Sequence, residues 1–238
     1  NSIDIRSINY KISYICQKNH KKEIDSLKRD YEINDDEIFE DDIPLGLWQG
    51  DKDEIILCPF SDCADHWAKK QIVKVTEAEI MSPITETEFR PNVKVTRAEF
   101  VTTLGRLENI DTTGRKVKSF NDVNSNKFYT PYIAWAEENG ILANENNKKF
   151  RPDDFITREE MATMLCKYLV NVREAILTGG LDFIDQDKIS LWARDYISLV
   201  SGMDFVSGRT DGSFDPKAGV TRAELATLLV RIMEEFNL

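Results

Sequence analysis

Apolar residues recur with a helical period in several short segments of the chain. Around residue 195 they fall on one face of a 3.6-residue repeat, and Ser190 is the expected N-cap. The residues of this face are Trp192, Ala193, Tyr196, Ile197 and Val200. An earlier segment repeats the spacing with Phe128, Tyr129, Tyr132, Ile133 and Ala136. Each segment predicts an amphipathic helix of about three turns.

A second type of helix is predicted by a four-residue motif that occurs three times. The motif is Thr96-Arg97-Ala98-Glu99, Thr157-Arg158-Glu159-Glu160 and Thr221-Arg222-Ala223-Glu224. A threonine hydroxyl can accept the amide three residues on while the glutamate returns to the threonine amide, so the motif predicts a capping box. Apolar stripes follow it, formed by Phe100, Leu104, Leu107, Met161, Leu165, Tyr168, Leu225, Leu228 and Leu229.

The two helix types belong to one repeated unit of helix, loop and helix. A Phe-Arg-Pro or Phe-Asp-Pro sequence ends each loop, where proline blocks helix continuation. Three units align without a gap from the aromatic position to the capping threonine. The aligned sets are Trp67, Phe128 and Trp192; Ile72, Ile133 and Ile197; Phe89, Phe150 and Phe214; and Thr96, Thr157 and Thr221. The sequence therefore predicts a tandem repeat.

The repeats are expected to span residues 58–110, 118–172 and 181–238. A unit of about fifty residues cannot bury both of its apolar stripes alone, so the three units should pack together. The predicted fold class is therefore mainly α.

Residues 1–57 do not follow the repeat. Alternating apolar residues near the start predict one or two strands, residues 21–30 a short helix and residues 54–57 another strand. Residues 32–42 are mostly acidic, which favours a solvated linker over a calcium loop, because the glycine and ligand spacing of such a loop are missing. This segment is expected to be a small α+β subdomain, a linker or the tail of a preceding module.

The net charge of the chain excludes some classes of binding partner. The chain of 238 residues has 42 acidic and 31 basic side chains and a net charge of -11, which argues against nucleic acid and anionic lipid surfaces. No segment resembles a membrane span or a signal peptide, so membrane insertion is not expected. Because the chain begins with Asn1, we expect a processed product or a fragment.

The cysteines do not predict a metal site or a cofactor. Cys58 and Cys63 match neither a redox nor a zinc spacing, and the chain has two histidines, His20 and His66. The four cysteines, Cys16, Cys58, Cys63 and Cys166, are expected to be free or partly buried thiols, with a disulfide such as Cys16 to Cys58 as the alternative.

Taken together, the motifs resemble the S-layer homology repeat, in three copies over about three quarters of the chain. The resemblance rests on the order Phe-x-Asp, aromatic pair, Gly-Ile or its equivalent, Phe-x-Pro and Thr-Arg-Ala-Glu. It implies a pseudo-threefold assembly with a central helix bundle. It also implies inter-repeat grooves that bind secondary cell-wall polysaccharide, often through a terminal pyruvylated amino sugar. A secreted protein on a Gram-positive cell wall or in its S-layer is then expected.

Arg97, Arg158 and Arg222 are the main candidate ligand-binding residues. A cation in the first turn of a helix opposes the macrodipole, so its presence three times calls for compensation. A carboxylate ligand beside the helix start could supply it through bidentate hydrogen bonds. An intramolecular pair with a nearby Asp or Glu is the alternative.

Aromatic residues and loop glycines are further candidates. Trp67 and Trp192, with Phe128 and Trp135, could stack on a sugar, although their helical spacing makes core packing the default. The resemblance implies two loop glycines per repeat; the first position is Glu79, Gly140 or Asp204 and the second is Pro83, Asn144 or Gly208. Gly140, Asn144 and Gly208 are therefore candidate ligand contacts. The groove at Pro83 is expected to be closed or repurposed, and three equal sites are not expected.

The predicted function is non-covalent anchoring of a secreted or S-layer protein to the cell wall. No catalytic motif is present, so an enzyme is not expected. A self-associating surface-lattice module without sugar binding is one alternative. An attachment module of a larger cell-surface enzyme is another.

Overall fold

The computed structural model describes residues 58–142, 148–180 and 182–238. The chain separates into two units, Asn1–Pro59 and Phe60–Leu238. The strands, the short helix and the acidic linker expected in residues 1–57, and the subdomain they would form, lie outside the described residues and stay predictions.

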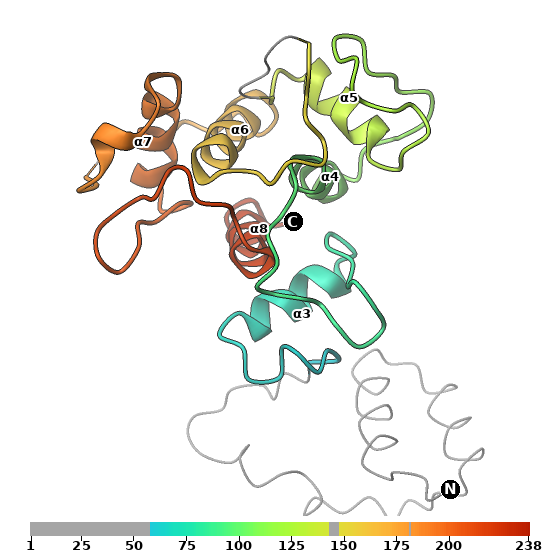
Figure 1. Ribbon diagram of the computed structural model, residues 1–238, viewed down its shortest axis with the longest axis horizontal. Helices are drawn as coiled ribbons and strands as arrows, with labels where there is room; N and C mark the ends of the chain where they lie inside the picture. Colours follow the sequence, from blue (N-terminus) through green and yellow to red (C-terminus); the bar gives the residue numbers. More distant parts are fainter. Residues whose placement is uncertain (1–57, 143–147, 181) are drawn as a thin grey trace, which may run out of the picture. The chain divides into compact units, whose positions relative to one another are not determined.

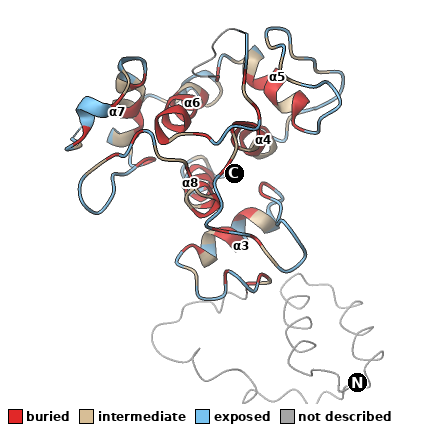
Figure 2. Ribbon diagram, viewed as in Figure 1, coloured by how far each residue is buried: buried red, intermediate tan, exposed pale blue. Residues whose placement is uncertain are grey.

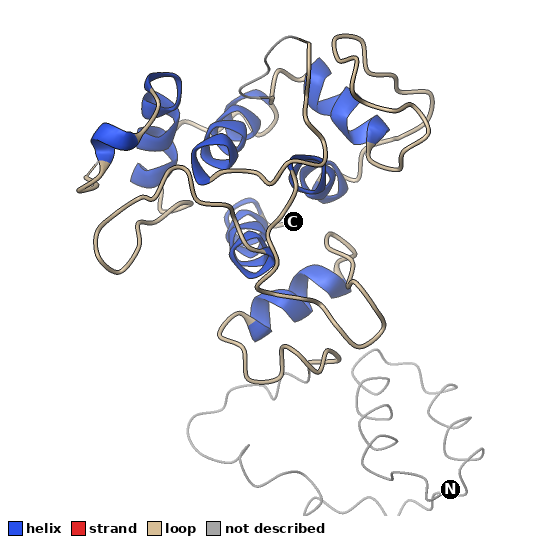
Figure 3. Ribbon diagram, in the orientation of Figure 1, coloured by secondary structure: helices blue, strands red, loops and turns tan. Residues whose placement is uncertain are grey.

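Across the part of the second unit that the structure describes, helices are joined by loops, and β-pairing is limited to isolated bridges (Figure 3). The mainly α fold class is therefore confirmed. The helices are α3 (Lys69–Glu77), α4 (Arg97–Leu107), α5 (Thr130–Glu138), α6 (Arg158–Asn171), α7 (Arg194–Gly202) and α8 (Arg222–Phe236), with 3-10 turns η3 (Gln186–Lys188) and η4 (Leu191–Ala193).

The second helices of the repeats, α4, α6 and α8, are grouped around the centre of this unit, and α3, α5 and α7 lie outside them (Figure 1). Each outer helix packs on the inner helix of the preceding repeat, α5 on α4, α7 on α6 and α3 on α8. The inner helices are also the most continuously buried (Figure 2). The contacts therefore run in cyclic order, while the pseudo-threefold relation of whole repeats stays a prediction.

The outer helices begin later than the apolar pattern predicts. Trp67 and Phe128 precede α3 and α5, and Trp192 lies in η4 ahead of α7. Trp67 is 65% exposed, Phe128 67% and Trp192 39%, so the default of core packing is wrong for these three side chains. Trp135 lies within α5 and is buried, as core packing requires.

Ser190 does not cap a helix, contrary to the expectation. Its hydroxyl and its amide each donate to the carboxylate of Glu159, at 3.1 Å, and Lys217 contacts the same carboxylate. A charged acceptor forms a stronger hydrogen bond than a neutral one, which explains why the hydroxyl turns away from the helix start. The contact links α6 to the third repeat.

All three predicted capping boxes are present. The hydroxyls of Thr96, Thr157 and Thr221 accept the amide three residues on, and the glutamates return to the threonine amides. The first two amides of each inner helix donate to carbonyls in the loop of the next repeat. In α4, Arg97 donates to the Asp154 carbonyl at 2.9 Å and Ala98 to the Pro152 carbonyl at 3.0 Å. The amides that a helix start leaves unpaired are therefore satisfied within the chain.

Just ahead of the inner helices, three amides close a ring between the repeats. Val95 donates to the Val220 carbonyl at 2.8 Å, Val220 to the Ile156 carbonyl at 3.2 Å, and Ile156 to the Val95 carbonyl at 2.9 Å. Each repeat thus contributes one donor and one acceptor, and no repeat can be removed without leaving both unpaired.

The Phe-x-Asp motif fixes the Phe-x-Pro loop of its own repeat. In the third repeat the Asp185 carboxylate accepts the amides of Phe214 at 2.7 Å and Asp215 at 2.9 Å, and the rings of Phe183 and Phe214 lie 5.1 Å apart. The other repeats form the same contacts through Asp62 and Asp122. Burial alone raises the pKa of Asp185, but these amides stabilise the carboxylate and hold its pKa below the ordinary 3.8.

The motif arginines link neighbouring repeats. The Arg97 side chain has no exposed surface: its Nε donates to the Phe150 carbonyl at 2.8 Å, its guanidinium lies 5.0 Å from the Phe150 ring centre, and its Nη1 is 2.9 Å from Glu160 Oε1. Arg222 makes the same set of contacts with Phe89 and Glu99. The compensation that a first-turn cation requires is thus supplied within the chain, by the capping glutamate of the next repeat.

Cys58, Cys63 and Cys166 are buried. Burial raises the pKa of the Cys166 thiol to about 11, so this residue stays protonated at neutral pH. Cys16 lies outside the described residues, and the disulfide from Cys16 to Cys58 stays a prediction.

We predict that Asp185→Asn lowers the free energy of unfolding by about 1–3 kcal/mol at pH 7, because one amide loses its acceptor. Since the native pKa is depressed, the contribution of Asp185 is present above the unfolded value of 3.8 and is lost as the pH falls through the native value. Denaturant unfolding at pH 7 and below pH 3.8 measures this, with exposed Asp187→Asn as the control. A pH-independent difference between wild type and Asp185→Asn would contradict the assignment.

We predict that Arg97→Ala destabilises the protein by about 3–5 kcal/mol, because it leaves the buried Glu160 carboxylate without one of its partners. Lys74→Ala, which removes an exposed pair with Glu234, should cost at most about 1 kcal/mol. Urea unfolding compares the two variants. Equal losses would show that the buried pair contributes no more than a surface pair.

Candidate functional site

A cavity of about 250 Å³ lies where all three repeats meet, and we call it the Trp67 groove. Trp67 comes from the first repeat, Arg158 from the start of α6 in the second, and Gly208 from the loop after α7 in the third. The remaining lining residues are Met161, Phe205, Val206, Ser207, Arg209, Glu224, Thr227, Leu228 and Arg231. Three residues that the sequence singled out separately are thus brought together.

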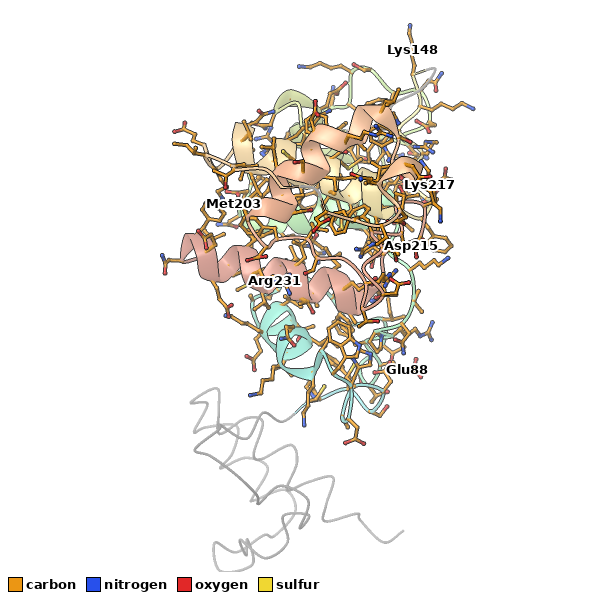
Figure 4. All side chains as sticks on the ribbon, turned by 90° about the vertical axis from the view of Figure 1, so that its left-hand side faces the viewer. Glu88, Lys148, Met203, Asp215, Lys217 and Arg231 are labelled. Atoms are coloured by element: carbon orange, nitrogen blue, oxygen red, sulfur yellow. The ribbon has the colours of Figure 1, made fainter. Side chains whose placement is uncertain are left out.

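The Trp67 groove is cationic. Arg158, Arg209 and Arg231 line it together with one acidic residue, Glu224. Arg231 projects from α8 on the side of the molecule shown in Figure 4, where Asp215 is also labelled. In a protein with a net charge of -11, this local excess of positive charge favours an anionic ligand.

Arg158 is held at the inner wall of the groove by two carbonyls. Its Nε donates to Phe214 at 2.7 Å and its Nη2 to Ser207 at 2.8 Å, whereas its Nη1 is 3.9 Å from Glu224 Oε1. Burial lowers the pKa of Arg158, and the neighbouring Arg209 lowers it further. Nη1 is therefore the least strongly engaged of these donors, and the carboxylates of Glu224, Asp215 and Asp185 favour the charged form of the side chain.

Gly208 is favoured by close packing, because a larger residue would require its neighbours to shift. A Cβ atom there would lie 3.0 Å from the Phe183 ring and 3.1 Å from the Ser213 carbonyl oxygen. The glycine therefore lets the loop lie directly against the Phe-x-Asp motif, and this contact sets the position of the groove wall.

The cavity beside Pro83 contains no motif arginine, so the expectation that the groove at Pro83 is closed or repurposed stays a prediction. This cavity, of about 500 Å³, lies between the loop after α3, the C-terminal half of α4 and α5. Its lining residues, which define the Pro83 groove, are Thr76, Ala78, Glu79, Met81, Ser82, Pro83, Gly105, Arg106, Asn109, Ile110 and Tyr132. Arg106 and Glu79 give it one charge of each sign.

The missing glycine in the first repeat does not alter the backbone at the first loop position. Glu79, Gly140 and Asp204 all have positive φ, at 58°, 64° and 58°. An L-residue is strained in this region, but in each repeat the amide of the next residue donates back to the preceding helix, as Ile80 does to the Val75 carbonyl at 3.0 Å. The first loop position is thus conformationally equivalent in the three repeats.

The other candidate residues are not gathered at these two cavities. Arg97 and Arg222 are enclosed by their ion pairs, Gly140 follows α5, and Trp192 lies in η4. Asn144 lies outside the described residues. A ligand contact by any of these five residues stays a prediction.

Sequence reasoning missed Arg209 and Arg231. Arg231 occupies the same offset from the capping threonine as Arg106 and Lys167, so the repeat alignment alone could have revealed a basic position. Arg231 donates to the Asp204 carbonyl at 2.9 Å and Arg106 to the Ser82 hydroxyl at 3.0 Å. Arg209 has Ile84 and Glu145 as its counterparts, so no repeat signal marks it.

Within the described ranges, no three His, Cys, Asp or Glu side chains are grouped to hold a metal ion. None of the helices described is both long enough and apolar enough to cross a membrane.

Comparison with known proteins gives matches over about three quarters of the chain to enzymes and surface proteins of much greater length. The chain is 35% identical over 179 residues to the amylopullulanase of Thermoanaerobacterium thermosulfurigenes, covering 74% of the chain and 10% of that protein. It is 32% identical over 181 residues to exoglucanase XynX of Acetivibrio thermocellus, covering 75% and 16%. It is 27% identical over 174 residues to an S-layer protein of Bacillus thuringiensis subsp. finitimus, covering 73% and 21%.

The family model of the S-layer homology domain matches residues 59–101, 119–162 and 182–226, which together make up more than half of the chain. These segments contain the three Phe-x-Asp motifs, Phe-x-Pro loops and capping boxes described above. The chain therefore belongs to the S-layer homology domain family, of which it carries three tandem repeats.

Proposed function

We propose that the chain attaches a surface protein to the bacterial cell wall by binding an acidic sugar of a secondary cell-wall polysaccharide in the Trp67 groove. Family membership and the similarity to an S-layer protein support the attachment role. The observation that carries the sugar-binding step is the convergence of Trp67, Arg158 and Gly208, from three different repeats, in one cationic cavity.

The charges of the groove favour a carboxylate. Arginine presents a planar fork of donors that matches the two oxygens of a carboxylate. Arg158 and Arg231 line the same cavity, and Glu224 balances one of its three arginines. A pyruvyl ketal on an amino sugar carries one carboxylate, so such a sugar has the charge that this cavity can accept.

The remaining walls suit a sugar ring. Trp67 exposes most of its indole and can stack on the C–H face of a sugar. A volume of about 250 Å³ is smaller than the roughly 300–1,000 Å³ of sites for drug-sized ligands, which favours a single sugar unit over a long chain segment. The end of a polymer is therefore the favoured ligand.

We further propose that this chain supplies attachment and no catalysis. The enzymes to which it is similar are matched over 10% and 16% of their length, a fraction comparable with the match to the S-layer protein. Attachment to a larger protein, which is an enzyme in some cases and a lattice protein in others, is compatible with each of these relatives. Self-association in a surface layer is an additional role with no specific contact in its favour.

Trp67→Ala should weaken binding of a pyruvylated amino sugar about tenfold or more, which corresponds to about 1.4 kcal/mol. Arg231→Gln should weaken it as well and reduce its salt dependence, because one cation is removed. Both side chains are exposed, so folding should be retained. Calorimetry and cosedimentation with purified cell-wall polymer measure the two effects.

The matched control is Phe155→Ala, which removes an exposed aromatic side chain that lines neither cavity. The methyl ester of the same sugar, or a depyruvylated polymer, provides the chemical control. Unchanged binding of depyruvylated polymer would overturn the carboxylate assignment, and unchanged binding by Trp67→Ala would move the site elsewhere.

The three repeats should provide fewer than three equivalent sites for the acidic sugar. Arg97 is fully enclosed, Arg222 is tightly paired with Glu99, and the Pro83 groove balances Arg106 against Glu79. Calorimetric stoichiometry with a pyruvylated monosaccharide tests this. Three sites of equal affinity would contradict the expected inequality.

A further inference from the structure

The three motif arginines differ in their distance from the capping glutamate of the next repeat. Arg97 lies 2.9 Å from Glu160 and Arg222 is in closer contact with Glu99, but Arg158 Nη1 is 3.9 Å from Glu224 Oε1. Among these pairs, the loosest is the one that lines the Trp67 groove.

Glu224, the capping glutamate near Arg158, forms its closer ion pair with another cation. Arg209 Nη1 lies 2.8 Å from Glu224 Oε1, and Arg209 Nη2 lies 3.6 Å from Asp215 Oδ2. The second oxygen of Glu224 accepts the Thr221 amide at 2.8 Å. Glu224 therefore pairs more closely with a loop residue of its own repeat than with Arg158.

The first repeat offers a direct comparison. Arg222 Nη2 donates to the Ser82 carbonyl at 2.7 Å, as Arg158 Nη2 donates to the Ser207 carbonyl. The residue two positions after Ser82 is Ile84, at the position that Arg209 holds in the third repeat. With the same loop contact and an uncharged residue in the loop, the pair of Arg222 with Glu99 is tight.

A shared glutamate alone does not loosen the pair. Glu160 accepts Arg151 at 2.7 Å and still holds Arg97 at 2.9 Å. Arg151, however, belongs to the Phe-Arg-Pro loop and lines neither cavity, whereas Arg209 lies in the groove wall. The combination of a loop carbonyl on Arg158 and a cation in the groove wall is what distinguishes the Trp67 groove.

We propose that Arg209 is a positioning residue that makes the Trp67 groove selective for anionic ligands, by holding Glu224 away from Arg158 Nη1 so that a ligand carboxylate can bind there. This inference rests on the proposed function, since it names the residue that sets the charge preference of the same site. Arg209 acts through Glu224 and Arg158 and is not itself required to touch the ligand.

The test is Arg209→Ile, because isoleucine, as Ile84, occupies the equivalent position in the first repeat. Glu224 should then pair with Arg158, and binding of a pyruvylated amino sugar should weaken about tenfold, while binding of its methyl ester should stay unchanged. Adding Glu224→Gln should restore most of the lost affinity, because glutamine retains the capping hydrogen bond but cannot neutralise Arg158. Calorimetry with the two sugars measures each variant, and thermal unfolding verifies the fold.

A second double variant separates positioning from net charge. Arg209→Ile with Asp215→Asn has the same net charge as Arg209→Ile with Glu224→Gln, but leaves Glu224 free to pair with Arg158. It should therefore remain weak. Asparagine is well suited to position 215, which has a φ of 58°.

The outcomes distinguish the positioning role of Arg209 from sugar binding in the Trp67 groove. Full affinity in Arg209→Ile, no rescue by Glu224→Gln, or equal rescue by both double variants would each overturn the positioning role while leaving the proposed function intact. Equal affinity of the wild type for the acidic sugar and its ester would overturn both.

Discussion

The ion pair between the first-turn arginine of one repeat and the capping glutamate of the next is the contact on which the assembly depends. The glutamate accepts the amide of its own N-cap threonine and also neutralises the arginine of its neighbour, so helix initiation and repeat association share one side chain. A buried ion pair is a weak source of net stability, but it strongly penalises any arrangement that leaves one partner alone. Two close pairs of this kind, Arg97 with Glu160 and Arg222 with Glu99, together with the ring of backbone hydrogen bonds ahead of the helices, favour a single cyclic order of the repeats.

The same contact explains why repeats with nearly identical motifs need not bind alike. A first-turn arginine that is fully paired contributes little to the electrostatic potential of a groove. Arg97 and Arg222 are in this state, whereas Arg158 shares its glutamate with Arg209 and faces a cavity. One substitution in a loop is thus enough to change the charge of a groove without any change in the motif itself.

The loops also show how backbone conformation can be preserved when its usual residue is replaced. Glu79 and Asp204 adopt the left-handed conformation that Gly140 adopts in the second repeat. The strain of a non-glycine residue there is of order 1–3 kcal/mol, which is small compared with the packing that surrounds the loop. The loss of glycine from this position in the first repeat therefore left the backbone conformation of the loop unchanged.

The sequence by itself determined the repeat, the three capping boxes and the mainly α fold, because these depend on residues within a few positions of one another. It also supplied Trp67, Arg158 and Gly208 as candidates. Only the tertiary structure decided that these three share a cavity, that Trp67 is exposed, and that Arg209 and Arg231 join them. The physical reason is that the partners of each side chain come from other repeats, so burial and net charge at the groove are set only when the ring of repeats closes.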